Sequence, residues 1–297
     1  MNVLFGPYGS VFPALGLSAD VLKVARHGQQ DWYRLAVEMI ARGYVNAGAT
    51  MPTVNAFFLR PVLHAGFTEL FKDMLLLNIQ ALLSALANKE HQRIAICLGP
   101  VNDCYTPQAA PETKQAYIFH KQQYELCLEV LGRVGLSRDD VVFLHETIGT
   151  EREALGLTQA AQALEIPLIV SFVVGSDGCL LSGENVETVI TLIDDQTGGF
   201  VEGFALNCCS LYAFERVAAT FKNKDGVKRI IGFYPNSYDA DPTTYESEVA
   251  LFEPHKRDSL KVIADIANAN KLNFVGGCCG FGYPDVKLLV EFVVSKN

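Results

Sequence analysis

Residues 140–174 read DVVFLHETIGTEREALGLTQAAQALEIPLIVSFVV, and this stretch sets the expected fold. It begins with an apolar run at 140–146 and ends with a second run at 167–174, and both have the length and composition of buried strands. Between them, residues 152–164 carry Ala and Leu at helical spacing. A strand, a helix and a second strand in this order form the βαβ unit of a parallel sheet.

The same alternation continues in both directions along the chain. Apolar runs predict strands at 3–5, 49–55, 93–99, 140–146, 167–174, 203–208, 229–234 and 273–278. Helical spacing predicts helices at 31–46, 67–88, 112–131, 152–164, 184–192, 211–221, 245–269 and 285–294. Eight predicted strands that alternate with eight predicted helices indicate an α/β fold, namely a single (β/α)8 TIM barrel that forms one domain over residues 1–297.

An open doubly wound sheet is the alternative architecture. It would place a glycine-rich phosphate-binding turn after the first strand. The turn at residues 6–10 lacks the third glycine of that fingerprint, and Pro7 removes a backbone donor that a phosphate would use. The barrel is therefore the preferred prediction.

The composition indicates a globular protein without a nucleic-acid or membrane partner. Hydrophobic residues make up 49% of the chain, enough for a large core, and the formal net charge of -9 leaves no surplus of cations for phosphate groups. No run of about eighteen apolar residues occurs, and the first residues do not look like a secretion signal. We therefore expect a cytoplasmic protein whose eight cysteines stay reduced.

Half of the cysteines occur as two adjacent pairs, Cys208-Cys209 and Cys278-Cys279. Each pair ends a predicted strand, the sixth or the eighth, and the carboxyl ends of barrel strands meet at the face that carries active sites. Cys209 should point away from Cys208, because successive side chains of a strand alternate in direction. Cys208, Cys278 and Cys279 are therefore the candidate ligands of a Zn2+ ion that keeps its fourth position open.

Three thiolates on zinc favour a thiol substrate. Such a site has a formal charge of about -1, which makes it a weak Lewis acid for carbonyl groups. A substrate thiol bound there loses its proton and becomes a nucleophile near neutral pH. The predicted chemistry is alkyl transfer to sulfur, and the alternative is that these cysteines are merely small buried hydrophobic residues.

Other short motifs surround the cysteine pairs. The segments are GGCCG at 276–280, Asn207-Cys208, YVNAGA at 44–49, TVN at 53–55, LGP at 98–100, Glu146-Thr147, VSF at 170–172 and YPNS at 234–237. In this order they resemble the homocysteine S-methyltransferase family. The resemblance implies a zinc-dependent barrel enzyme that moves a methyl group to homocysteine and forms methionine, with Cys208, Cys278 and Cys279 as zinc ligands. The donor would be a sulfonium (S-methylmethionine or S-adenosylmethionine), a quaternary ammonium or a methylfolate.

Three residues are candidates for binding the small-molecule thiol acceptor and methyl donor. The family pattern implies that Glu146 lies near the acceptor's amino group, and a carboxylate at a strand end can pair with an ammonium. Asn55 ends the second predicted strand, and Asn236 follows the seventh. Phe5 and Val11 stand where the family's first-strand Asp and Glu would be. Two alternatives therefore stay open: a methyltransferase for another thiol, and a zinc-binding barrel without catalysis.

Overall fold

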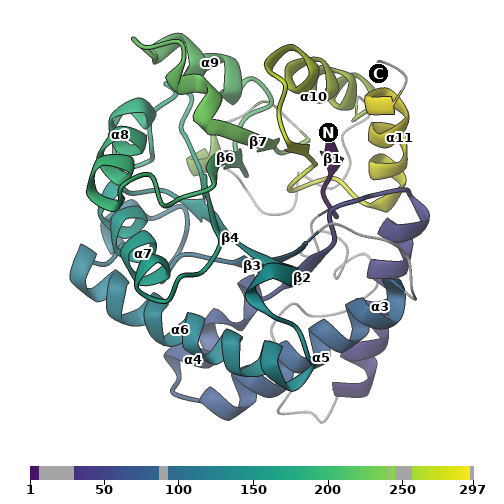
Figure 1. Cartoon of the computed structure of the whole chain (residues 1–297). Coiled ribbons are helices and arrows are strands. Elements are labelled where there is room, and N and C mark those ends of the chain that lie inside the picture. The colour runs from purple at the N-terminus through teal and green to yellow at the C-terminus, as the bar shows by residue number, and fades with distance from the viewer. Residues whose placement is uncertain (7–29, 87–92, 238, 240, 245–255, 295–297) are drawn as a thin grey trace.

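The computed structural model describes residues 1–6, 30–86, 93–237, 239, 241–244 and 256–294, and it has an α/β fold (Figure 1). Eight strands form one sheet in the order β1-β8-β7-β6-β5-β4-β3-β2, and every neighbouring pair is parallel. The strands are β1 Asn2–Val3, β2 Thr53–Asn55, β3 Ile94–Leu98, β4 Val141–Ile148, β5 Leu168–Phe172, β6 Gly203–Asn207, β7 Ile230–Tyr234 and β8 Phe274–Val275. Each of them overlaps a predicted strand, although β1 shares only Val3 with the predicted strand at 3–5 and β4 continues to Ile148 beyond the predicted end at 146.

The sheet is curled so that the first and last strands in its order approach each other. Phe5 N donates to Met51 O at 3.0 Å and Met51 N donates to Val3 O at 3.0 Å, just before β2 begins. In Figure 1 the strands surround a centre and the helices lie outside them. This arrangement is consistent with the predicted (β/α)8 barrel.

Helices connect the strands and cover the outer face of the sheet. They are α3 Gln30–Asn46, α4 Arg60–His64, α5 Thr68–Leu86, α6 Thr113–Arg133, α7 Glu151–Ala163, α8 Val186–Thr197, α9 Ala213–Thr220, α10 Lys256–Asn270 and α11 Tyr283–Val294. The short α4 was not predicted, and α8 extends beyond the predicted end at 192. Residues 87–88 and 245–255 of two predicted helices lie outside the described residues.

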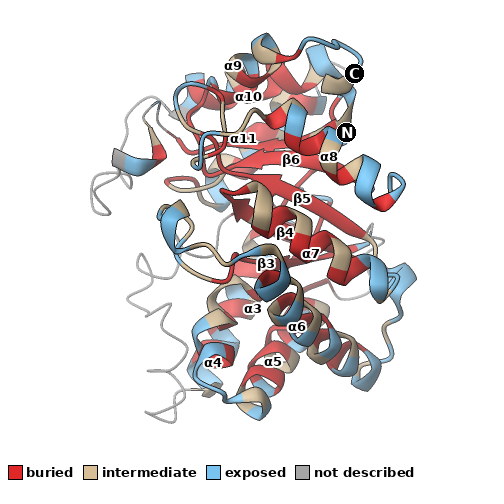
Figure 2. Ribbon diagram, turned by 90° about the vertical axis from the view of Figure 1, so that its left-hand side faces the viewer, coloured by how far each residue is buried: buried red, intermediate tan, exposed pale blue. Residues whose placement is uncertain are grey.

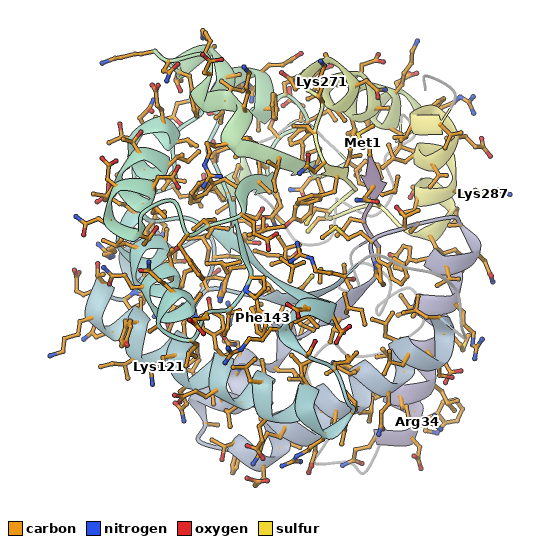
Figure 3. All side chains as sticks on the ribbon, viewed as in Figure 1. Met1, Arg34, Lys121, Phe143, Lys271 and Lys287 are labelled. Carbon is orange, nitrogen blue, oxygen red and sulfur yellow. The ribbon has the colours of Figure 1, made fainter. Side chains whose placement is uncertain are left out.

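Strand side chains are divided between two apolar cores, because successive side chains point to opposite faces of a sheet. Phe143 belongs to the core between the sheet and the helices, whereas Leu144 belongs to the core that the sheet encloses. The sheet is buried, and the helices are exposed mainly on their outer sides (Figure 2). Phe143 lies inside the molecule while Lys121 and Lys287 point outward (Figure 3). In the described part of the chain, no helix has both the length and the apolar character needed to span a membrane.

Helices α6 and α7 pack closely at Gly156. A Cβ atom there would lie 2.4 Å from the carbonyl oxygen of Thr113 and 2.7 Å from Cβ of Ala116. Gly156→Ala is therefore expected to lower the free energy of unfolding by about 1–3 kcal/mol, measured by urea denaturation. The control is Gly132→Ala on the exposed side of α6, where an added Cβ meets nothing within 4 Å and should be neutral or stabilising. Equal losses in both variants would contradict this packing argument.

Candidate functional site

Three cysteine thiols meet at the carboxyl ends of the strands. Cys208 directly follows β6, and Cys278 and Cys279 follow β8, which ends at Val275 and not at 278 as predicted. The three Sγ atoms all lie within 4.8 Å of one another, and those of Cys208 and Cys279 are 3.8 Å apart. A tetrahedral zinc ion with Zn–S distances of about 2.3 Å would separate its sulfur ligands by about 3.8 Å. The donor set and its spacing therefore fit a thiolate-bound metal.

Asn236 holds the two cysteine loops together. Its side-chain Oδ1 accepts a hydrogen bond from Cys279 N at 3.0 Å, and its backbone N donates to Cys209 O at 3.0 Å. Asn236 is fully buried. Cys208 has a φ of 50°, in the left-handed region that residues other than glycine seldom occupy. The bonds through Asn236 therefore support a turn that is locally unfavourable.

The thiols of the cluster differ in the direction of their pKa shifts. Hydrogen bonds from Cys208 and Cys278 hold the pKa of the Cys279 thiol well below its ordinary value. Hydrogen bonds with Cys208 and Cys279 raise the pKa of the Cys278 thiol. The cluster thus stabilises a thiolate, which is the form that binds metals. Cys209 is buried in the outer core and takes no part in the cluster, as predicted. The reason differs from the predicted strand alternation, because β6 ends at Asn207 and both cysteines lie in the turn that follows it.

Glu146 lies near the thiols on β4. The register of β4 against β5 shifts at this point, and the next residue, Thr147, has a φ of 61°. Burial raises the pKa of the Glu146 carboxyl to about 8, and the neighbouring Cys208 adds to the shift, while Tyr234 and Cys97 oppose it. A cation bound beside Glu146 would favour its charged form.

Asn207 links three strands next to the thiols. Its Oδ1 accepts hydrogen bonds from Thr147 N at 2.9 Å and Ser171 Oγ at 2.7 Å, and its Nδ2 donates to Thr147 Oγ1 at 2.9 Å. Because Thr147 adjoins Glu146 and Asn207 adjoins Cys208, the network sets the spacing between carboxylate and thiol. From the sequence, Asn207 was only part of a motif. Its one signal in the sequence was an asparagine directly before a candidate ligand.

Asn55 ends β2 with its side chain almost wholly buried. Its Nδ2 has no hydrogen-bond partner among the described residues, although its backbone carbonyl accepts from Asn78 Nδ2 at 2.7 Å. Asn55 pairs in register with Cys97 of β3, whose thiol lies close to Glu146. A buried donor without a partner is costly, and it suits a site that receives a polar ligand.

Phe5 does not enter this site. Its ring packs against Tyr44 of α3 with the ring centroids 5.5 Å apart, in the core between the sheet and the helices. Position 5 therefore contributes neither charge nor contact at the thiols. The second departure from the family pattern, Val11, lies outside the described residues.

The segment between β3 and α6 carries Cys104 and Tyr105 toward the thiols. Burial raises the pKa of the Cys104 thiol to about 12, with a further contribution from the nearby Cys208. The base of the segment is held by Glu153 of α7, whose Oε1 accepts from Val101 N at 2.6 Å. No role was predicted for Cys104, because an isolated cysteine in a polar loop is not part of a recognisable spacing of metal ligands.

These features define a class of protein: a parallel α/β fold with a metal-competent set of three thiols and a carboxylate at the strand ends. The sequence profile described as homocysteine S-methyltransferase matches residues 10–293. The chain therefore belongs to the homocysteine S-methyltransferase family and is a methyltransferase enzyme.

Solved structures support the fold. The oxidized form of the homocysteine methyltransferase MmuM from Escherichia coli superposes with a TM-score of 0.74 at 16% identity, covering 98% of this chain and 95% of that one. The metallated form of MmuM gives a TM-score of 0.71 at 17% identity, covering 97% and 95%. No curated protein matches the chain in sequence.

Proposed function

We propose that the chain is a zinc-dependent methyltransferase that forms methionine from homocysteine. The methyl donor would be a sulfonium, S-methylmethionine or S-adenosylmethionine, or a similar compound. The observation that carries the proposal is the convergence of three Sγ atoms within 4.8 Å at the strand ends. Family membership and the likeness to a metallated homocysteine methyltransferase support the same reading.

Cys208, Cys278 and Cys279 would hold the Zn2+ ion. Zinc bound by three thiolates would keep the sulfur of the acceptor as a thiolate near neutral pH. In the transfer, the acceptor thiol loses its proton and its sulfur forms a bond to the methyl carbon. The bond between that carbon and the donor sulfur breaks, and its electron pair neutralises the sulfonium.

The remaining site residues would bind and orient the acceptor. Glu146 would pair with the ammonium group of homocysteine, because a carboxylate beside the thiols can form a charge-assisted hydrogen bond with a cation there. Asn55 would offer its unpartnered Nδ2 to a polar group of the substrate. Asn236 would help to position the substrate indirectly, through the hydrogen bond that its Oδ1 accepts from Cys279 N.

Architecture and location follow from the same proposal. We expect residues 1–297 to form one domain with a closed (β/α)8 barrel, supported by the parallel bridge between Leu4 and Met51. All eight cysteines are free, and the thiols bind metal only in reduced form, so a reducing compartment such as the cytoplasm suits them.

The test begins with metal analysis of protein kept reduced, where we expect about one zinc per chain. Methyl transfer is then assayed with homocysteine and either sulfonium. Absence of metal from reduced protein supplied with zinc would overturn the proposal. Zinc-loaded protein that methylates only another thiol would support the alternative of a changed acceptor. Zinc-loaded protein that methylates none of the thiols would indicate a zinc-binding barrel without catalysis.

A further inference from the structure

A layer of polar side chains closes the enclosed core on the side of the thiols. Leu144, Ile169 and Ala205 belong to that core on β4, β5 and β6. Two residues further along the same strands stand Glu146, Ser171 and Asn207, which therefore share the inward face. Tyr234 of β7 is itself a member of the enclosed core. The polar layer thus comprises these four residues together with Asn55 of β2.

The hydrogen bonds within this layer are incomplete. Asn207 and Ser171 satisfy each other at 2.7 Å, and Asn207 bonds further to Thr147. In contrast, the Tyr234 hydroxyl makes no well-aligned hydrogen bond within the described structure, although the Glu146 carboxyl and Ser171 lie close to it. Tyr234 is only 2% exposed. The hydrogen-bonding capacity of this buried hydroxyl is therefore incompletely used, and it is available to a further polar group beside Glu146.

The Tyr234 residue is fixed by strand pairing and by a ring contact. Its backbone pairs in register with Asn207 on β6, and its ring lies 6.1 Å, centroid to centroid, from that of Phe274. An added Cβ at Gly276 would come within 3.3 Å of the Tyr234 Cβ atom. The hydroxyl is therefore presented in a fixed direction beside Glu146, as expected of a pre-organised binding group.

We infer that Tyr234 is an acceptor-binding residue whose hydroxyl acts with the Glu146 carboxylate to recognise the ammonium group of a thiol amino acid. The inference rests on the proposed function, which names that acceptor. The phenol oxygen accepts a hydrogen bond from the ammonium, or donates to the carboxylate that pairs with it. Both arrangements give the buried hydroxyl a well-aligned hydrogen bond in place of its poorly aligned contacts with Glu146 and Ser171. They also make the ammonium group a determinant of specificity.

Tyr234→Phe tests this role, with Tyr124→Phe as the matched control. Tyr124 is equally buried, but its hydroxyl bonds to the Leu157 carbonyl in the helix layer at 3.4 Å. Each variant is assayed for the KM and kcat of homocysteine and for the inhibition constant of 4-mercaptobutyrate. That inhibitor has the carbon chain, thiol and carboxylate of homocysteine but no amino group. Zinc content and thermal midpoint are recorded alongside.

In Tyr234→Phe we expect a KM for homocysteine about tenfold higher, a loss near 1.4 kcal/mol of binding. The values of kcat, zinc content and the inhibition constant of 4-mercaptobutyrate should stay within about twofold, and Tyr124→Phe should leave all of them unchanged. With Glu146→Gln added, the two effects should combine to less than their product, because both residues contact one group.

Three outcomes would overturn the inference. They are an unchanged KM, an equal weakening of homocysteine and 4-mercaptobutyrate, and loss of zinc, since the last two would show a structural role. If zinc-loaded wild-type protein fails to methylate homocysteine, the proposed function itself is rejected and the acceptor named here falls with it. Normal wild-type turnover with an unaffected Tyr234→Phe variant rejects only the role of Tyr234.

Discussion

Cys278→Ser is expected to abolish stoichiometric zinc binding and to lower methyl transfer by more than about a hundredfold. Serine has nearly the same shape, but its hydroxyl stays protonated at neutral pH and so cannot replace a thiolate ligand. Even residues that only support metal ligands typically change affinity by about 10- to 100-fold, so removal of a ligand should exceed that range. Zinc per chain is measured on reduced protein, and activity is measured with homocysteine and a sulfonium donor.

The matched control for this prediction is Cys179→Ser. Cys179 is also partly exposed and lies outside the three-thiol cluster, in the segment between β5 and α8. The Cys179→Ser variant should keep full zinc content and activity. Full zinc content in Cys278→Ser would show that the metal is bound elsewhere and would remove the basis of the proposed chemistry.

Glu146→Gln is expected to raise the KM for homocysteine about 10- to 100-fold while zinc content stays unchanged. A charge-assisted hydrogen bond contributes about 1.5–3 kcal/mol, and each 1.4 kcal/mol is a factor of ten in affinity. Glutamine keeps the shape of the side chain but not the charge that pairs with an ammonium. The measurement is steady-state kinetics over a range of homocysteine concentrations.

Glu125→Gln serves as the control for the lost carboxylate. Glu125 lies on α6, where it forms an exposed ion pair with Lys121 at 2.7 Å, and such pairs contribute little to stability. The Glu125→Gln substitution should leave the kinetics unchanged. If Glu146→Gln changed kcat and zinc content but not the KM, Glu146 would support the metal site and would not bind the acceptor.

Much of the fold was predictable because its signals are local. The apolar runs of all eight strands are short and bounded by polar or glycine-containing segments, and the helices between them have regular spacing. Boundaries were less certain. The predicted eighth strand continued to residue 278, but β8 ends at Val275 and Gly276-Gly277 separates it from the cysteines. An apolar composition does not show where strand pairing stops.

The direction of individual side chains was harder to predict. Phe5 was compared with an acid that would face the site, yet its ring packs outward against Tyr44. In a strand, a shift of one residue moves a side chain to the opposite face, so a short motif without a fixed register does not determine which face it occupies. Asn207 and Tyr234 gave equally little signal, because their neighbours come from other strands.

The sequence by itself determined the alternation of strands and helices, the two adjacent cysteine pairs and the family motifs, since these depend on residues close together along the chain. Only the tertiary structure decided that Cys208 and Cys279 lie 3.8 Å apart, that Asn207 joins Thr147 and Ser171, and that the Tyr234 hydroxyl is buried beside Glu146. These relations connect residues from different strands. Their distances are set by the register and curl of the parallel sheet, and no local pattern in the chain specifies those.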